Sequence, residues 1–202
     1  MVVAAAALGI AAGVAINLLH HRDRPSPGAS LPRLLGQATW PAGARPAPDF
    51  SLADQDGRRT TLASLRGRAV MLTFLDSRCH RPCAREVRPL AVALRLLPRS
   101  ARPVVVVVSA DPWGDTRGSA RAAARRWGLT AGSSWHWLLG SRSELAPVWR
   151  SYRIAVRRTR GGVAHTPATY LIDRRGFERA GLLYPFPPSW PAGDLRALAQ
   201  ES

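Results

Sequence analysis

The two cysteines of the chain, Cys79 and Cys83, are the side chains best suited to chemistry. They follow an apolar run at residues 69–75, which has the composition of a buried strand. A structural disulfide or two inert buried thiols are the plain alternative, because cysteine is among the most buried residue types. The loop between them carries His80 and Arg81, however, and is a poor apolar site. We therefore interpret the pair as functional.

The spacing of the cysteines limits what two thiols can do together. If a helix starts near Pro82, as a proline in the first turn allows, Cys79 precedes the helix and Cys83 lies in its first turn. Residues four apart on one helix have Cβ atoms about 5–6 Å apart, whereas a disulfide needs about 3.5–4.5 Å, so a disulfide requires the loop to fold inward. Two thiolates on one metal ion tolerate the wider separation. The C-x-x-x-C spacing suits metal at least as well as redox chemistry, which a C-x-x-C pair would have favoured.

The charge of the chain does not indicate nucleic-acid binding. The net charge is +16, and all 29 basic residues are arginine, which suggests a coding bias. The arginines are spread along the chain, without the basic stripe or aromatic platform of a nucleic-acid binder. We interpret the short arginine cluster at residues 157–160, which runs into two glycines, as a solvated loop. The sequence also lacks a Walker loop, an HExxH motif and a Ser/His/Asp triad pattern.

The amino terminus predicts a membrane segment. Residues 2–19 are almost wholly apolar, near the short end of the roughly 17–25 residues that span a bilayer. We expect residues 1–21 to be an uncleaved anchor, with a signal peptide as the rival, and His20 and His21 to lie at the interface. The domain should face the extracytoplasmic side of the cell membrane, although the basic residues after the segment favour the opposite orientation. Residues 22–46, rich in proline, glycine and alanine, form the predicted linker, and residues 47–202 the domain.

The remainder of the chain alternates between strand and helix patterns. Five consecutive valines at residues 104–108 are typical of a strand buried on both faces of a parallel sheet. A turn signal ending at Gly57 indicates a hairpin before the main sheet. This order predicts an α/β fold, a sheet with helices on both faces, and it places the cysteines at the carboxyl end of a strand, where open α/β sheets bind ligands. The expected strands are 69–75, 104–108, 135–139, 168–172 and 177–183, and the expected helices are 86–97, 117–127, 141–150 and 194–199.

Several other polar residues have structural interpretations. His136, between two tryptophans, is expected to be a partly buried histidine with its hydrogen bonds satisfied. Asp111 and Asp115 fit turn and capping roles at the start of the second helix. Ser141 and Glu144 form a capping-box pattern for the third helix.

With these elements in place, the sequence resembles the Sco/SenC family, the thioredoxin-fold copper chaperones of cytochrome c oxidase assembly. The resemblance runs from Phe50 to Asp173 and is carried by four motifs in order. These are the Asp-Gly hairpin with Leu62 and Gly67, the Leu72-Thr73-Phe74 strand entering Cys79-x-x-x-Cys83, the valine strand entering Ser109-x-Asp111-Pro112-x-x-Asp115-Thr116, and His165 before Tyr170-Leu171-Ile172-Asp173.

The resemblance implies a thioredoxin-like fold with a mixed central sheet, and one copper ion bound by Cys79, Cys83 and His165. It further implies delivery of copper to the copper-bearing subunit of cytochrome c oxidase or to another copper protein. Thiolate ligands suit Cu(I), and an added imidazole also suits Cu(II) and zinc, so zinc is the second candidate metal. His80 could replace His165 as a ligand, but we expect it to face solvent.

Two differences from the family pattern keep a second function open. Ala84 follows Cys83 where the family usually has proline, and the proline here is Pro82. The Thr166-Pro167 segment is closer to the proline-bearing loop of thioredoxin-like oxidoreductases. The alternative is therefore a thiol–disulfide oxidoreductase that acts on exported protein thiols, with the two cysteines as its redox pair.

Overall fold

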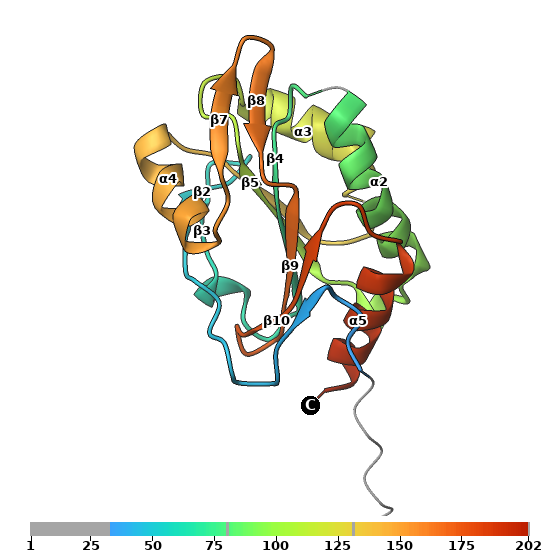
Figure 1. The fold of residues 1–202 in the computed structure, drawn as a ribbon. Coiled ribbons are helices and arrows are strands. Elements are labelled where there is room, and N and C mark those ends of the chain that lie inside the picture. Colours follow the sequence, from blue (N-terminus) through green and yellow to red (C-terminus); the bar gives the residue numbers. More distant parts are fainter. Residues whose placement is uncertain (1–32, 80, 131, 202) are drawn as a thin grey trace, which may run out of the picture. The chain divides into compact units, whose positions relative to one another are not determined.

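Two almost wholly apolar strands lie side by side in the interior of the sheet (Figure 1). Strand β4 (Val70–Leu75) pairs in parallel with β5 (Val104–Ser109), in a register that places Val70 opposite Val104. Every residue of both strands is buried. A strand covered on both faces needs apolar side chains at successive positions, which confirms the prediction made from the valine run.

The computed structural model describes residues 33–79, 81–130 and 132–201. The predicted anchor at residues 1–21, with His20 and His21, lies outside these ranges, as do residues 22–32 of the predicted linker and His80. Within the described ranges, no helix combines the length and apolar content needed to cross a membrane.

Four further strands complete a mixed sheet. Strand β6 (Trp135–Leu138) extends the sheet in parallel beside β5. On the other side, β9 (Ala168–Ile172) runs antiparallel to β4, followed by β10 (Glu178–Leu183) and the short edge strand β1 (Ala38–Thr39). The strand order is β1-β10-β9-β4-β5-β6. The mixed central sheet agrees with the expected fold class.

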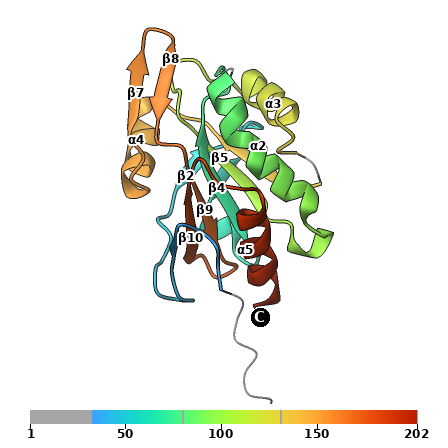
Figure 2. The ribbon, with the colours of Figure 1, turned by 45° about the vertical axis from the view of Figure 1, so that its right-hand side comes forward.

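Helices cover both faces of this sheet (Figure 2). Helices α2 (Arg81–Leu96), α3 (Arg117–Arg126) and α5 (Ser189–Gln200) pack on one face, where they share a core with alternate side chains of β4 and β5. Helix α4 (Arg142–Ser151) packs on the other face, and its core there includes Leu52, Phe74 and Trp149. Two short 3₁₀ helices, Ala63–Leu65 and Arg99–Ala101, connect these elements.

Two hairpins flank the sheet, and the sequence predicted one of them. Strands β2 (Ser51–Ala53) and β3 (Arg59–Thr61) form the expected hairpin, with Gly57 at a φ of +80°. This hairpin also covers the β6 edge, because Ala53 bridges to Leu139 and the Gln55 side chain accepts a hydrogen bond from the Trp137 backbone N–H at 2.7 Å.

The second hairpin was not predicted. Strands β7 (Val156–Thr159) and β8 (Gly162–His165) pair antiparallel. The interpretation of residues 157–160 as a loop was therefore wrong, although these arginines are exposed as expected for solvated residues. A two-stranded ribbon with exposed, charged side chains has no apolar alternation, so its sequence does not display the usual strand signal.

The helix ends follow their capping residues. Helix α2 begins at Arg81, so Cys83 lies in the first turn as predicted. Ser141 and Glu144 form the predicted capping box of α4, whereas α3 is capped by Thr116 with Ser119. Helix α5 begins five residues before the predicted start at residue 194, because its one proline, Pro191, lies in the first turn, where the missing N–H is tolerated.

Part of the predicted linker belongs to the folded unit. Residues 38–39 form β1 and pair with β10, and the Trp40 backbone N–H donates to the Arg179 carbonyl at 3.0 Å. The buried Asp194 carboxylate on α5 accepts hydrogen bonds from the backbone N–H groups of Leu35 and Gly36. The folded unit thus includes residues before residue 47, the predicted first residue of the domain.

Helix α2 offers a matched test of its packing on the sheet. Leu90 is fully buried on the sheet side, and Leu96 is 51% exposed. Leu90→Ala should lower the free energy of unfolding by about 2–5 kcal/mol, because it removes buried methyl groups and leaves a cavity. Leu96→Ala should change it by less than about 0.5 kcal/mol. Urea denaturation of both variants measures the difference, and equal losses would contradict the packing described here.

Candidate metal centre

The two cysteines lie directly after the carboxyl end of β4, where they are joined by a disulfide. Their Cα atoms are 5.8 Å apart, and the Cys83 backbone N–H, in the first turn of α2, points to Cys79 Sγ at 3.3 Å. The Cys79 N–H donates to the Asp76 carbonyl at 3.2 Å. These bonds fold the loop inward, which is the condition that the spacing set for a disulfide. Cys83 is buried and Cys79 is partly exposed.

His165, far away in the sequence, reaches the same place. It is the last residue of β8, and its side chain is 5% exposed. Its Nδ1 contacts the Thr166 carbonyl at 3.2 Å. A carbonyl only accepts hydrogen bonds, so this contact places the proton on Nδ1 and the lone pair on Nε2. Burial lowers the pKa of His165, which favours the neutral imidazole that a metal ion requires.

A third side chain, Glu86, completes the group and was missed at the level of sequence. It lies one turn after Cys83 on α2, and its Oε2 is 4.0 Å from His165 Nε2. Within the described part of the chain, its Oε1 is buried and has no hydrogen-bond partner. Burial raises the pKa of Glu86 to about 8. The i to i+3 spacing from Cys83, which places both residues on one helix face, was the signal available.

Together these side chains form a donor set that fits a soft transition metal. One ligand atom each from Cys83, Glu86 and His165 lies within 4.8 Å of the other two. Ligands about 2.0–2.3 Å from one ion are separated by somewhat less than this, so a small inward shift brings the three together. Reduction of the disulfide would free both sulfur atoms as thiolate ligands, since neither is a thiolate while the S–S bond is present. Two thiolates and one imidazole suit copper, and the buried carboxylate oxygen without a partner would gain one from a cation.

Three carboxylates lie next to the start of the cysteine loop, and Asp115 is hydrogen-bonded to it. Asp115 accepts hydrogen bonds from the Ser77 N–H at 2.9 Å, the Ser77 hydroxyl at 2.5 Å and the Ser109 hydroxyl at 2.6 Å. It therefore connects the loop after β5 to the cysteine loop. The expected capping role at α3 is not taken by Asp115, because Thr116 is the N-cap of that helix. Asp111 has the expected turn role, since it accepts from the Trp113 N–H at 3.1 Å. Asp76 lies with these two acids, and burial raises its pKa.

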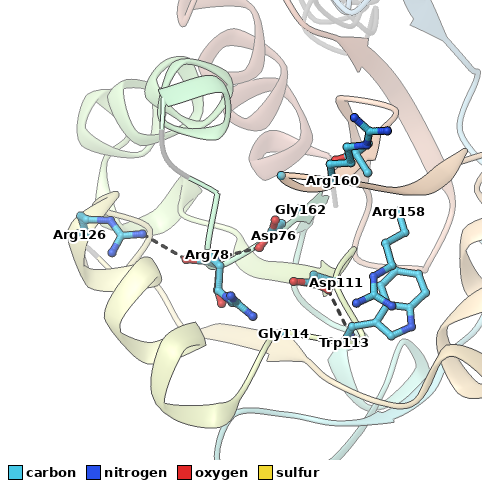
Figure 3. A pocket seen from close by; sticks show the side chains of 12 residues that line it. Asp76, Arg78, Asp111, Trp113, Gly114, Arg126, Arg158, Arg160 and Gly162 are labelled. Atoms are coloured by element: carbon cyan, nitrogen blue, oxygen red, sulfur yellow. Dashed lines mark hydrogen bonds between the residues drawn. The ribbon is translucent and has the colours of Figure 1, made fainter.

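A polar cleft of about 630 Å³ opens beside the cysteine loop (Figure 3). Figure 3 shows Arg158 next to Trp113 on one side, and the guanidinium carbon lies 5.4 Å from the centre of the ring. On the opposite side, Arg126 donates to the Ser77 carbonyl at 3.2 Å. The cleft is lined by Asp76, Ser77, Arg78, Asp111, Trp113, Gly114, Arg126 and residues 158–162. The unpredicted β7–β8 hairpin thus supplies one wall of the cleft.

His136 is partly buried and its Nδ1 lies 3.0 Å from Asp54 Oδ2, which confirms the predicted structural role. Among the described residues, the cis peptide bond joins Tyr184 and Pro185, and the Thr166–Pro167 bond is trans.

Comparison with known proteins identifies the family. The SCO1/SenC family profile matches residues 40–199, most of the chain. The chain belongs to the SCO1/SenC family. Its fold is thioredoxin-like, as the resemblance implied. ScoI from Arabidopsis thaliana, solved with copper bound, is 26% identical, with a TM-score of 0.67 over 76% of this chain and 98% of that chain. Copper-bound ScoI from Bradyrhizobium japonicum is 25% identical, with a TM-score of 0.64 over 76% of this chain and 98% of that chain.

The chain is also similar to a thiol–disulfide oxidoreductase. The thiol–disulfide oxidoreductase ResA of Geobacillus thermodenitrificans is 28% identical over 130 residues, which are 64% of this SCO1/SenC chain and 63% of ResA. The match therefore spans less than two thirds of the length of that relative.

The environment of Asp115 predicts a pH-dependent stability. Burial raises its pKa from the usual 3.8 to about 6, so its ionisation opposes folding and the stability it contributes is lost as the pH rises from about 4 to about 6. Asp115→Asn keeps the size of the side chain and avoids this loss. The unfolding free energy of the variant, relative to that of the unsubstituted chain, should increase by about 2–3 kcal/mol between pH 4 and pH 7.

Urea denaturation across this pH range measures the effect. Asp56→Asn is the matched control, because the Arg121 guanidinium holds the pKa of the exposed Asp56 carboxyl below its usual value. Its pH dependence should have the opposite sign, since a lowered pKa contributes stability that is present at higher pH. A pH-independent difference for Asp115→Asn would show that the carboxyl ionises as easily in the folded chain as in the unfolded one.

Proposed function

We propose that this protein is a membrane-anchored copper metallochaperone. Cys79 and Cys83, as thiolates, and the Nε2 atom of His165 would hold one copper ion for delivery to a copper centre of cytochrome c oxidase. The observation that carries the proposal is the convergence of the cysteine pair and a buried, neutral imidazole at one end of the sheet. The copper-bound relatives of the same family support the choice of metal.

The arrangement suits an ion that must be released again. Two thiolates and one imidazole bind soft copper tightly but leave coordination positions for a ligand from another protein. Cys79 is partly exposed, whereas Cys83 and His165 are buried. A partner could therefore displace Cys79 first and take the ion in steps, while the two buried ligands still hold it.

Copper uptake requires prior reduction of the Cys79–Cys83 disulfide. A dithiol donor would supply the two electrons and two protons: its two S–H groups become a disulfide as the bond between Cys79 and Cys83 opens to two thiols. Each thiol then loses its proton when it binds the metal. The same sulfur atoms cannot form the disulfide and hold copper at once, so the two states exclude each other.

A thiol–disulfide oxidoreductase is the second candidate. The disulfide between the two cysteines and the similarity to ResA favour it. In that function the cysteine pair would exchange electrons with exported protein thiols directly. The buried His165 would not take part in that exchange, and this difference separates the two functions.

The copper hypothesis predicts a defined stoichiometry. The reduced full-length chain in detergent should bind about one Cu(I) ion, because three soft or borderline donors converge at one point. Cys79→Ser or Cys83→Ser should abolish tight binding, since either change removes a thiolate. Chelator competition measures the affinity, and competition with zinc determines which ion the site prefers. Undiminished binding by the double cysteine variant would refute the site.

His165→Ala separates the two functions in a single variant. A chaperone should lose copper affinity and show little reduction of a model disulfide, with or without this change. An oxidoreductase should reduce the model disulfide without metal, and the substitution should barely alter its rate. His136→Ala is the matched control, because this histidine is bonded to Asp54 and is not part of the cysteine group. It should leave copper affinity unchanged.

The proposed location is tested separately. Residues 2–19 should hold the chain in the membrane with the domain on the extracytoplasmic side. A reporter that is active only outside the cytoplasm, fused after Ser202, should give a signal in cells, and the fusion should sediment with membranes. A silent reporter in the membrane fraction would reverse the orientation and weaken the link to oxidase assembly.

A further inference from the structure

We propose that Glu86 is a further copper ligand, one that binds Cu(II) and contributes little to the binding of Cu(I). This inference rests on the proposed copper function, and it deepens that function by assigning the site a preference between two oxidation states.

Glu86 lies close to two of the candidate copper ligands, Cys83 and His165. Its side chain is only 10% exposed, and its Oε2 lies 4.0 Å from the Nε2 atom of His165. A carboxylate oxygen of Glu86, a nitrogen of His165 and the Cys83 sulfur lie within 4.8 Å of one another. Helix geometry explains the nearness of Cys83 and Glu86, because residues three apart on α2 project from the same face.

The surroundings of Glu86 offer little else to compensate its burial. Its Oε1 is buried and has no hydrogen-bond partner in the described part of the chain. The other buried carboxylates near the site are satisfied: Asp115 accepts from Ser77 and Ser109, and Asp76 accepts from the Arg78 N–H at 2.8 Å. A buried polar group without a partner is unfavourable unless a ligand or ion supplies one. A metal ion held by Cys83 and His165 would do so.

The charge balance explains why the oxidation state matters. Cu(I) with two thiolates already carries a net charge of −1, so a carboxylate ligand would add a second negative charge in a buried site. Cu(II) with two thiolates is neutral, and a carboxylate brings the complex to −1. Oxygen and nitrogen donors also suit Cu(II), whereas Cu(I) prefers sulfur. Glu86 therefore favours the oxidised ion over the reduced one.

The test compares both ions on the same variant. Glu86→Gln keeps the shape of the side chain but cannot take the negative charge that the carboxyl gains when it binds a cation. In the reduced full-length chain, Cu(II) affinity should fall by at least about tenfold, while Cu(I) affinity stays within about twofold. The Cu(II) electron paramagnetic resonance spectrum should change because an oxygen donor is lost. The Cu(II)/Cu(I) midpoint potential should rise by about 59 mV for each tenfold selective loss. Free thiols are counted before and after Cu(II) is added, so that the Cu(II) that the cysteines reduce to Cu(I) can be subtracted from the bound Cu(II).

Glu178→Gln is the matched control. Glu178 is also buried, but it lies at the other end of the sheet, where it pairs with Ile172 and salt-bridges Arg45 at 2.6 Å. Its removal should leave the spectrum and both affinities unchanged. An unaltered spectrum and Cu(II) affinity in Glu86→Gln would overturn the ligand assignment while leaving the copper function intact. Equal losses for both ions would overturn the oxidation-state preference. Failure of the unsubstituted chain to bind either ion would overturn both the function and the role of Glu86.

Discussion

The parallel pairing of β4 with β5 is the constraint on which the site depends. Both strands are fully buried, and their register is uninterrupted from Val70 opposite Val104 to Leu75 opposite Ser109. Because the two strands run in the same direction, the loops that follow them leave the sheet at the same end, the carboxyl end of both strands. One loop carries the cysteines and the other carries Asp115, which bonds back to Ser77. The cysteine loop is thus anchored at its base to the neighbouring strand connection.

The reversed direction of β9 brings His165 to the same end of the sheet. Since β9 is antiparallel to β4, with Thr169 opposite Thr73, its first residues lie beside the end of β4. His165 comes three residues before β9 and is therefore delivered to the cysteines, although more than eighty positions separate them in the sequence. Helix α2, which follows the cysteine loop, adds Glu86 at the same end of the sheet. Three different elements meet there because the sheet is mixed, so that the start of β9 lies beside the end of β4.

The sequence predicted those parts of the fold that follow from local patterning. The valine run, the Gly57 turn and the Ser141 capping box are short signals whose cause is local, and each was confirmed. The β7–β8 hairpin and the true start of α5 were missed, because exposed arginines and clustered prolines give no apolar period. Glu86 was missed for another reason: its place beside His165 is a contact that only the folded chain creates. The inward fold of the cysteine loop, with its disulfide, likewise depends on backbone geometry that spacing alone left open.

The two edges of the sheet affect how another protein can approach. Exposed strand edges can recruit foreign strands, and proteins commonly protect them. Here β1 is only two residues long, and the β2–β3 hairpin covers β6 through the Ala53–Leu139 bridge and the Gln55 side chain. Neither side therefore offers a long free backbone to which a visiting chain could add a strand. Strand addition to the central sheet is disfavoured, which leaves its side chains and loops, and the separate β7–β8 ribbon, for contacts with another chain.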